Sequence, residues 1–406
     1  MSEPADTTAD SPPYFRPAWF LAGLLAGVLL LVFFGYATAG RSHFRDYKRL
    51  HPAISPEGSY YPTVDELCAL VRSRCGSDQV LVIVGGNSVF NGVGQPTAKL
   101  WTEELQRQLG NRYAVVNLAM RGALSTDGAA VVAEVLRAEY PRLIYVANTS
   151  PFKEPGALGS DTYRYLFWEA WHRGLLERTP ARKAAVARWW KDPAVSGQLE
   201  LAAMAQVDRF LRYRNVWNRV AMEHLFTVPS FYTPTWPKVA WARNRLPDNE
   251  PDFEDTPLNQ RMARSNTEVE MKIVRAFAGE YYEPDGAGGW RLQEMTRNSF
   301  RAGVAEAVPD ALKPGTLIVL SRNSPFYLRQ LDATERARED LAYRESLAIW
   351  REAGYAAMEY GADFEPEDYG DRTHLTANGG RRLARLVARE IEAQAAKLGY
   401  VGKEGR

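Results

Sequence analysis

The stretch Val80-Leu-Val-Ile-Val84-Gly-Gly-Asn-Ser88 decides how this chain is expected to fold. It begins with a continuous apolar run rich in β-branched side chains, which predicts a strand buried on both faces. The two glycines then allow a sharp turn. Ser88 follows at the point where a parallel sheet presents the carboxyl ends of its strands to a ligand crevice. The sequence therefore predicts an α/β protein with a polar turn at the edge of its sheet.

The same alternation of strand and helix recurs on both sides of this stretch. Further strands are predicted at residues 113–117, 143–147, 316–320 and 355–359. Helical spacing is present at residues 97–109, 126–138, 332–353 and 376–398. A capping-box pattern at Thr63 and Glu66 predicts one more helix, which ends near Gly76. Because short connections join these elements, we expect right-handed crossovers and a three-layer α/β/α sandwich, flavodoxin-like, around a five-stranded parallel sheet.

A long segment without this alternation separates the predicted elements into two groups. We expect a disordered tail at 1–16, a transmembrane helix at 17–40, a linker at 41–61, the first half of the α/β core at 62–154, a mainly helical insertion or cap at 155–312, and the second half of the core at 313–400. Most tryptophans lie in the insertion. There they either form its core, line a sugar-binding cleft or rest at a membrane interface.

Composition is that of an ordinary globular protein, and it excludes some functions. The formal net charge is +1 with acids and bases interspersed, so we expect no nucleic-acid partner, which would require a basic face. No two histidines or cysteines share a ligand-like spacing with a carboxylate, and no phosphate-loop or dinucleotide fingerprint is complete. We therefore expect no metal and no cofactor. The histidines interpreted as having no catalytic role are His43, His51, His172 and His224.

Residues 17–40 form an apolar segment without a charged side chain. As a helix of about 1.5 Å rise, its 24 positions reach about 36 Å, enough to cross a hydrocarbon core of about 30 Å. The alternative is a cleaved signal peptide, because Ala37-Thr38-Ala39 resembles a signal-peptidase site. The length of the run and the acidic residues that precede it favour a retained anchor.

Two features bear on the compartment of the main domain. The apolar segment is followed by the basic residues Arg41, Arg45, Lys48 and Arg49. The positive-inside tendency would keep that side cytoplasmic, which argues against export. Cys68 and Cys75, the only cysteines, could form a disulfide in an oxidising compartment. On one continuous helix they would lie about 10 Å apart, so a disulfide requires the helix to break near Ser73.

Two distant motifs carry the residues that nucleophilic catalysis requires. Gly86-Asn87-Ser88-Val-Phe-Asn-Gly92 places a hydroxyl in a turn, and Asp371-Arg-Thr-His374 supplies an acid and a base. A serine becomes a good nucleophile when a base takes its proton and a third group orients that base. Each motif also has a structural interpretation, as a glycine turn and as the start of a helix capped by Thr376. The α/β-hydrolase elbow is excluded because position 90 is Phe rather than Gly.

These motifs resemble the four blocks of the SGNH hydrolase superfamily, also called GDSL-like hydrolases. The first block, Gly-Asp-Ser-x-x-x-Gly, is similar to residues 86–92, with Asn87 in place of Asp. The second, a glycine after the second strand, is matched by Gly122. The third, Gly-x-Asn-Asp, is matched at Asn148 alone, since Val146 and Thr149 differ. The last, Asp-x-x-His, is matched by residues 371–374. The resemblance covers about 78–150 and 314–398 and leaves out the insertion.

The resemblance implies an activity and a set of site residues. Ser88 would be the nucleophile, His374 its general base and Asp371 the group that orients the imidazole. The oxyanion hole would consist of the backbone amides of Ser88 and Gly122 and the side-chain amide of Asn148. The implied reaction is hydrolysis or transfer of an acyl ester. The departures at Asn87, Val146 and Thr149 affect the loop geometry and the oxyanion hole.

The predicted architecture is similar to that of anchored SGNH-like proteins of polysaccharide acylation, including the D-alanyl-transfer protein of teichoic acid modification. The resemblance implies an acylated glycan or other ester as substrate, partner proteins of an envelope polysaccharide system, and an extracytoplasmic (periplasmic) active site on the cytoplasmic membrane. Two alternatives remain. One is a non-catalytic glycan-binding or scaffold protein of an exopolysaccharide assembly, favoured by the altered blocks. The other is a lipid or thioester hydrolase at the membrane surface.

Overall fold

A parallel sheet lies at the centre of the computed structural model. The structure describes residues 17–38, 48–50, 62–153, 155–156, 158–160, 162–191, 252–264, 267–279 and 281–401. The predicted disordered tail, most of the predicted linker and the stretch 192–251 of the predicted insertion lie outside these residues.

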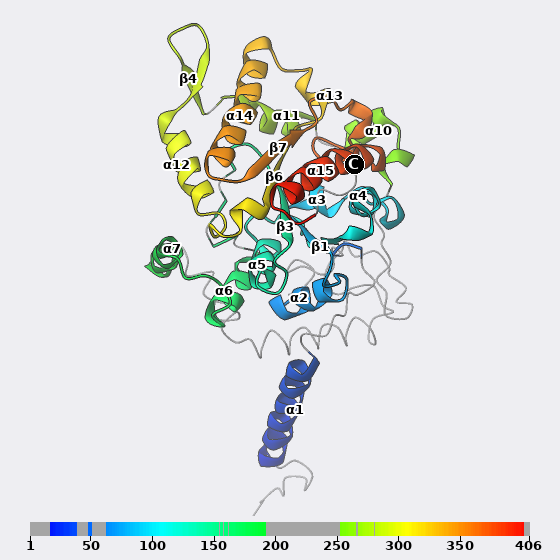
Figure 1. The fold of residues 1–406 in the computed structure, drawn as a ribbon, viewed down its shortest axis with the longest axis vertical. Coiled ribbons are helices and arrows are strands. Elements are labelled where there is room, and N and C mark those ends of the chain that lie inside the picture. Colours follow the sequence, from blue (N-terminus) through cyan, green and yellow to red (C-terminus); the bar gives the residue numbers. More distant parts are fainter. Residues whose placement is uncertain are drawn as a thin grey trace, which may run out of the picture.

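Five strands form the sheet, and all of them are parallel (Figure 1). They are β1 (Val80–Gly85), β2 (Tyr113–Asn117), β3 (Leu143–Thr149), β6 (Thr316–Ser321) and β7 (Ala356–Tyr360). Their order is β2-β1-β3-β6-β7, so the chain changes direction across the sheet between β1 and β3. The predicted five-stranded parallel sheet is thereby confirmed, with strand ends that differ by one or two residues from those expected. A change of direction of this kind opens a crevice at the carboxyl ends of the strands.

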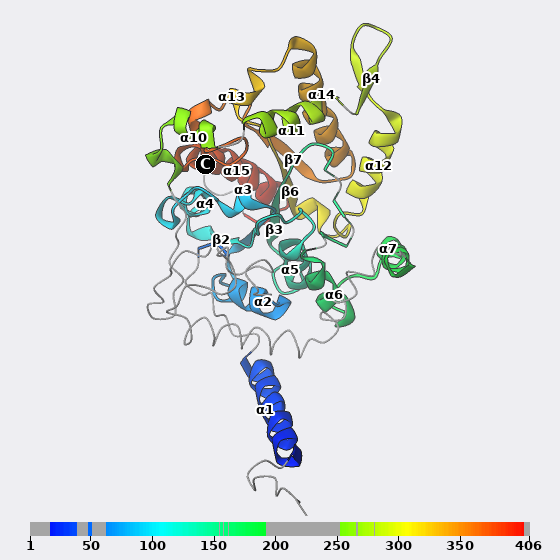
Figure 2. The ribbon, with the colours of Figure 1, turned by 180° about the vertical axis from the view of Figure 1, so that it is seen from behind.

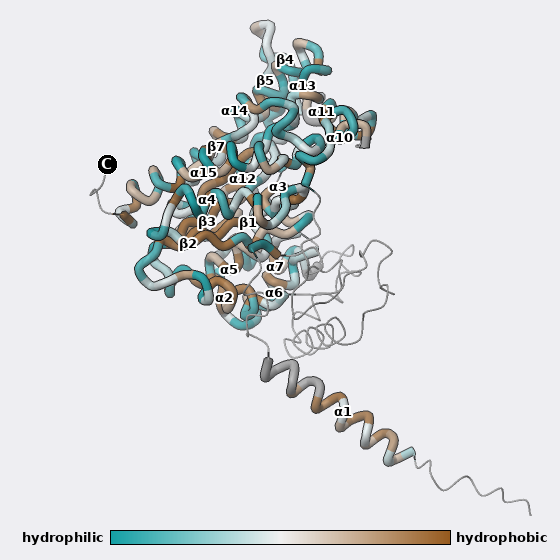
Figure 3. The backbone as a smooth tube through the Cα atoms, turned by 90° about the vertical axis from the view of Figure 1, so that its right-hand side faces the viewer, coloured by the Kyte–Doolittle hydropathy of each residue, from teal (hydrophilic) through white to brown (hydrophobic). Residues whose placement is uncertain are grey.

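Helices cover both faces of the sheet (Figures 1 and 2). One face carries α2 (Val64–Arg72), α5 (Gly128–Leu136), α6 (Arg164–His172), α12 (Glu294–Ala305) and α14 (Ala333–Glu352). The other carries α4 (Trp101–Leu109) and α15 (Ala377–Lys397). Since successive side chains of a strand point to opposite faces, Leu81 packs on the first layer and Val82 on the second. In Figure 3 β1, β2 and β3 are coloured as hydrophobic, as strands buried on both faces must be.

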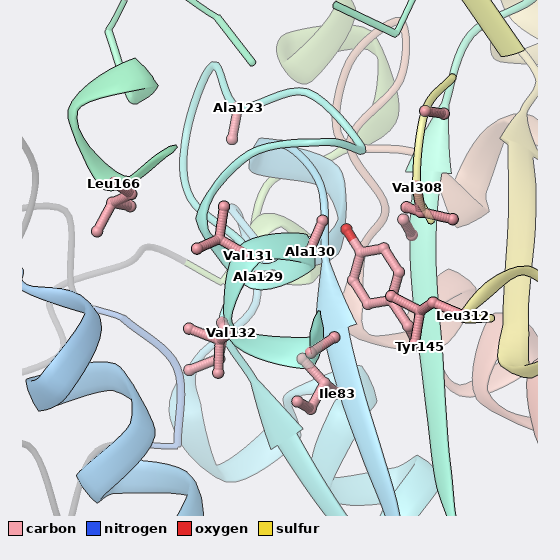
Figure 4. Close-up of a cluster of buried hydrophobic side chains, with 14 of the residues drawn as sticks. Ile83, Ala123, Ala129, Ala130, Val131, Val132, Tyr145, Leu166, Val308 and Leu312 are labelled. Carbon is pink, nitrogen blue, oxygen red and sulfur yellow. The ribbon is translucent and has the colours of Figure 1, made fainter. Parts of the chain in front are cut away.

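The packing of α5 on the sheet shows how closely the layers approach. Figure 4 shows Ile83 of β1 and Tyr145 of β3 beside α5, with Ala130 of this helix next to the Tyr145 ring. Tyr145 is buried, and its hydroxyl donates a hydrogen bond to the Ser125 carbonyl at 2.6 Å. This bond satisfies the one polar atom that the ring would otherwise bury without a partner.

Helix ends follow the capping signals in the sequence. The capping box at Thr63 and Glu66 is present at the start of α2, as predicted. This helix ends at Arg72, with Ser73 as its C-cap. Cys68 and Cys75 are both buried and free, so the disulfide that the sequence allowed is not formed. Burial raises the pKa of Cys68 to about 12 and that of Cys75 to about 11.

Helices of the predicted insertion contribute to the main core. The buried side chains of Trp168 and Trp171 on α6 belong to the same cluster as Leu81 and Ile83 of β1. Trp189 of α7 (Pro180–Lys191) contacts Trp168 with the ring planes tilted and the ring centroids 4.8 Å apart. These tryptophans are core residues, whereas Trp217, Trp236 and Trp241 lie outside the described residues. The described part of the insertion also contains α10 (Leu258–Arg264), α11 (Thr267–Gly279), β4 (Tyr282–Pro284) and β5 (Trp290–Leu292).

The apolar segment near the start of the chain forms α1 (Pro17–Thr38), a helix of 22 residues. Side chains of α1 are described for residues 17–30 and 33, and the large apolar ones among them, including Trp19 and Leu25, are exposed. Within the part of the chain that the structure describes, no helix is both long enough and apolar enough to cross a membrane.

Candidate active site

Ser88 lies in the turn that follows β1, at the first position of the short helix α3 (Ser88–Asn91). Asn87 caps this helix, because its Oδ1 accepts a hydrogen bond from the Val89 amide at 2.9 Å. Gly86 precedes the cap with φ of 102°, a conformation that side chains other than glycine disfavour. A methyl group at Gly86 would also overlap Oδ1 of Asn148. The turn therefore needs glycine both for its backbone angle and for the close approach of β3.

A reciprocal pair of asparagines joins this turn to the end of β3. The backbone amide of Asn87 donates to Asn148 Oδ1 at 3.0 Å, and the side-chain Nδ2 of Asn148 donates to Asn87 Oδ1 at 2.9 Å. Asn148 Nδ2 also donates to Ser321 Oγ over a longer 3.4 Å. Asn148 is buried, so these bonds satisfy an amide that would be costly to leave without partners. One Nδ2 hydrogen is thus engaged by Asn87, and the second makes only a weak bond.

His374 and Asp371 lie in the loop between β7 and α15. The loop is closed by a bridge between Tyr369 and Leu375, and Gly370 donates to the His374 carbonyl at 2.7 Å. Within it, Asp371 Oδ1 accepts hydrogen bonds from the amides of Thr373 at 2.9 Å and His374 at 2.8 Å. Thr376 then caps α15 through a bond from the Gly379 amide. The residues that follow His374 therefore form a capped start of α15, as the structural interpretation predicts. This does not prevent Asp371 and His374 from taking part in catalysis.

The two motifs meet in a chain of hydrogen bonds. His374 Nε2 lies 2.8 Å from Ser88 Oγ, and His374 Nδ1 lies 2.6 Å from Asp371 Oδ2. Because an ionised carboxylate can only accept, Nδ1 carries the proton and Nε2 is left to accept from the serine hydroxyl. The side chains of His374 and Asp371 are partly accessible, at 21 % and 30 %. This arrangement lets a base remove the Ser88 proton at a place that a substrate can reach.

The environment of Asp371 keeps its carboxylate ionised. Burial alone would raise the pKa of Asp371. The hydrogen bond and charge of His374 and the backbone amides of His374 and Thr373 lower this pKa by more than burial raises it. The pKa therefore lies below its ordinary value, and the carboxylate holds the imidazole in one tautomer.

The loop that carries Gly122 is joined to the Ser88 turn. The Met120 amide donates to the Gly86 carbonyl at 3.0 Å, and Asn91 Nδ2 donates to the Ala119 carbonyl at 2.9 Å. Gly122 has φ of 73° and open space where a side chain would begin. The structure thus brings Ser88, His374 and Asp371 together, pairs Asn148 with Asn87, and places Gly122 on an adjoining loop. The oxyanion roles of Gly122 and Asn148 stay predictions.

Three buried amides that sequence reasoning did not single out connect the loops of the site. They are Asn91, Gln95 and Asn117. Asn117 Nδ2 donates to the Phe90 carbonyl at 3.0 Å. Gln95 accepts from the Trp101 amide at 3.0 Å and donates to the carbonyl of Leu375 at 3.2 Å. The only signal in the sequence was their polar character within apolar or glycine-rich segments, which does not reveal a partner hundreds of residues away.

Arg372 supports the loop between β7 and α15 from its other side. Its guanidinium forms an ion pair with Glu270 of α11 and donates to Asn323 Oδ1 at 2.8 Å. Its carbonyl accepts a hydrogen bond from the Ser324 amide at 2.8 Å. The loop is therefore tied both to the end of β6 and to a helix of the predicted insertion.

Comparisons with known proteins add nothing to the resemblance, which is carried by these residues alone. No protein-family model matches the chain, and no curated protein is similar to it at a significant level. Among the residues that the structure describes, no cluster of three or more histidines, cysteines and carboxylates could hold a metal ion.

Proposed function

We propose that this protein is a serine esterase or O-acyltransferase of SGNH type, acting on acyl esters of a cell-envelope polysaccharide. The observation that carries the proposal is the hydrogen-bonded chain from Ser88 Oγ through His374 to Asp371. Its distances are those expected of a nucleophile, its base and the group that orients the base. The site also lies at the carboxyl ends of β1 and β3, where the sheet changes direction.

The reaction follows from the positions of the protons. Ser88 Oγ attacks the acyl carbonyl while His374 Nε2 takes the hydroxyl proton, and Asp371 stabilises the imidazolium. The tetrahedral intermediate collapses when His374 gives that proton to the departing alcohol, which leaves the acyl group on Ser88. A water or a sugar hydroxyl, deprotonated by His374, then attacks the acyl-enzyme, and His374 gives that proton to Ser88 Oγ as the bond between Ser88 and the acyl group breaks. Backbone amides of Ser88 and Gly122 and the second Nδ2 hydrogen of Asn148 would stabilise the oxyanion, each worth about 2.7–4 kcal/mol.

An N-terminal membrane anchor belongs to the same proposal. It is supported by the uncharged apolar run of residues 17–40 in the sequence. An anchored enzyme would meet polymeric substrate at the membrane surface, with the domain after the anchor on the extracytoplasmic side. Partner proteins of an envelope polysaccharide system would then supply the acyl group or the glycan. The charge of the residues that follow the anchor opposes this orientation, so topology needs reporter fusions placed after Gly40.

Labelling with a fluorophosphonate tests the chemistry, because this probe reacts with an activated serine. The full-length protein should be labelled, the Ser88→Ala variant should not, and a Ser150→Ala variant should be labelled like the wild type. Activity on short acyl esters, long-chain esters and acylated glycans would then define the acyl group. Absence of labelling in the wild type, or equal labelling of Ser88→Ala, would reject the enzyme.

A non-catalytic glycan-binding role is the second candidate, and one observation favours it. The Asn148 amide, which the resemblance assigns to the oxyanion hole, is bonded to Asn87 and Ser321. Glycan binding without labelling of Ser88 would select this alternative.

A further inference from the structure

The predicted insertion sends one aromatic side chain between the two loops that carry the site. Phe253 lies in a short 3-10 turn, Phe253–Asp255, just before α10. A methyl group built on either Gly94 or Gly370 would overlap the same ring atoms of Phe253, Cδ2 and Cε2. One ring edge is therefore in contact with the backbone of both glycines.

Each of these glycines is coupled to a residue of the proposed triad. Gly370 precedes Asp371 and donates its amide to the His374 carbonyl at 2.7 Å. Gly94 follows the turn of α3, in which the amides of Gly92 and Val93 donate to the Ser88 carbonyl, both at 3.2 Å. The ring thus lies between the turn that carries Ser88 (residues 86–94, the serine loop) and the loop that carries Asp371 and His374 (residues 369–375, the Asp–His loop).

Polar contacts hold Phe253 in this place. Its amide donates to the Gly94 carbonyl at 3.1 Å. On either side, Asp252 pairs with Lys99 at 2.6 Å, and Glu254 accepts a hydrogen bond from the Asn378 amide at the start of α15. These contacts fix the backbone on both sides of the ring. If either loop moved toward Phe253, the ring could move away only by breaking some of them.

We propose that Phe253 is a positioning residue, a spacer from the insertion that sets the separation of the serine loop and the Asp–His loop. The insertion then helps to position the site, since its Phe253 and Glu270 contact the Asp–His loop at Gly370 and Arg372. Proton transfer depends on the Ser88–His374 distance, and a displacement of about 1 Å at a reacting centre can cost about 100-fold in rate. The kinetic part of this inference rests on the proposed function.

Substitution at Gly370 tests the spacer without touching a reacting group. Gly370 has an ordinary backbone conformation, so Gly370→Ala adds only a methyl group against the ring. We expect about a 100-fold loss of kcat with KM changed much less. Phe253→Ala should lower kcat by about tenfold, because the loops lose their spacer but not their other ties. The double variant Phe253→Ala/Gly370→Ala should recover to the level of Phe253→Ala. Gly279→Ala, with ordinary backbone and open space at the end of α11, is the matched control.

A second readout separates this inference from the proposed function. The Nδ1 proton of His374, bonded to Asp371, should give a low-field proton resonance in the full-length protein that is absent in His374→Ala. Gly370→Ala should shift or broaden it, and the double variant should restore it. Wild-type resonance and activity in Gly370→Ala, or no recovery in the double variant, would overturn the spacer. If Ser88 is unreactive while the resonance follows the expected cycle, the spacer stands and the enzyme fails.

Discussion

Replacement of Asp371 by Asn is the sharpest perturbation of the proposed triad, because the structure dictates how the amide must sit. Oδ1 of Asp371 accepts from two backbone amides, and Oδ2 faces His374 Nδ1 at 2.6 Å. In Asp371→Asn the oxygen will keep the two backbone amides, which leaves Nδ2 facing the imidazole. Two donors cannot face each other, so His374 must accept at Nδ1 and carry its proton on Nε2. That nitrogen can then no longer accept the proton of Ser88.

The expected loss is large because the wrong tautomer removes the base altogether. The comparable substitution in serine proteases lowers kcat by about 10⁴, which corresponds to about 5.5 kcal/mol in the barrier. The assay is kcat and KM for a short acyl ester, with thermal unfolding to verify that the fold persists. Asp363→Asn is a matched control, since Asp363 is close in the chain and its side chain is 71 % exposed. A kcat for Asp371→Asn within about tenfold of wild type would refute the assigned roles.

Two further predictions concern the Asn87 cap and a buried glutamate. Asn87→Asp should retain the hydrogen bonds from Val89 and Asn148, so ester hydrolysis should stay near the wild-type rate. Asn87→Ala loses both bonds, so we expect a loss of about 1 kcal/mol of unfolding free energy, measured by denaturation, and of most of the esterase activity. Burial raises the pKa of Glu339 to about 7 although Arg322 lowers it. Folding then binds a proton, so stability falls as pH rises from about 4.5 to 7. Glu339→Gln should therefore gain melting temperature relative to wild type across this window; a constant difference would contradict the assignment.

The fold could be predicted because local patterns and tertiary structure agree over most of the core. Short continuous apolar runs rich in β-branched side chains are typical of strands buried on both faces, and Tyr113–Asn117 was predicted to the residue. Capping signals at Thr63 and Thr376 likewise placed helix starts. The predicted helix 97–109 differs, because its first turn is the 3-10 segment Thr97–Lys99 and α4 begins only at Trp101. The extended Leu100, which separates the two segments, leaves no mark on the apolar spacing.

The residues of the proposed triad could be predicted from the sequence, and the residues that support them could not. Ser88, His374 and Asp371 could be found because a hydroxyl, an imidazole and a carboxylate follow predicted strands, at the edge where a parallel sheet presents its ligand crevice. Gln95 and Phe253 carry no such signal, since an amide or an aromatic ring is common in any loop. Their roles depend on contacts across more than 100 residues, and a sequence pattern of local period contains no information about those contacts.

Asn87, the departure in the first SGNH-like block, is hydrogen-bonded to Asn148, the residue that matches the third block. Asn87 offers one oxygen to two donors, the Val89 amide and Asn148 Nδ2, which is also what a carboxylate oxygen would do. Its side chain therefore preserves the cap that an aspartate would supply, without burying a charge beside β3. The same pairing fixes the rotamer of Asn148, so its second Nδ2 hydrogen is held in one direction instead of turning freely. Preorganised donors of this kind need no reorientation when charge develops on an oxyanion. Asn87 is thus compatible with catalysis, and the test of that compatibility is the reactivity of Ser88.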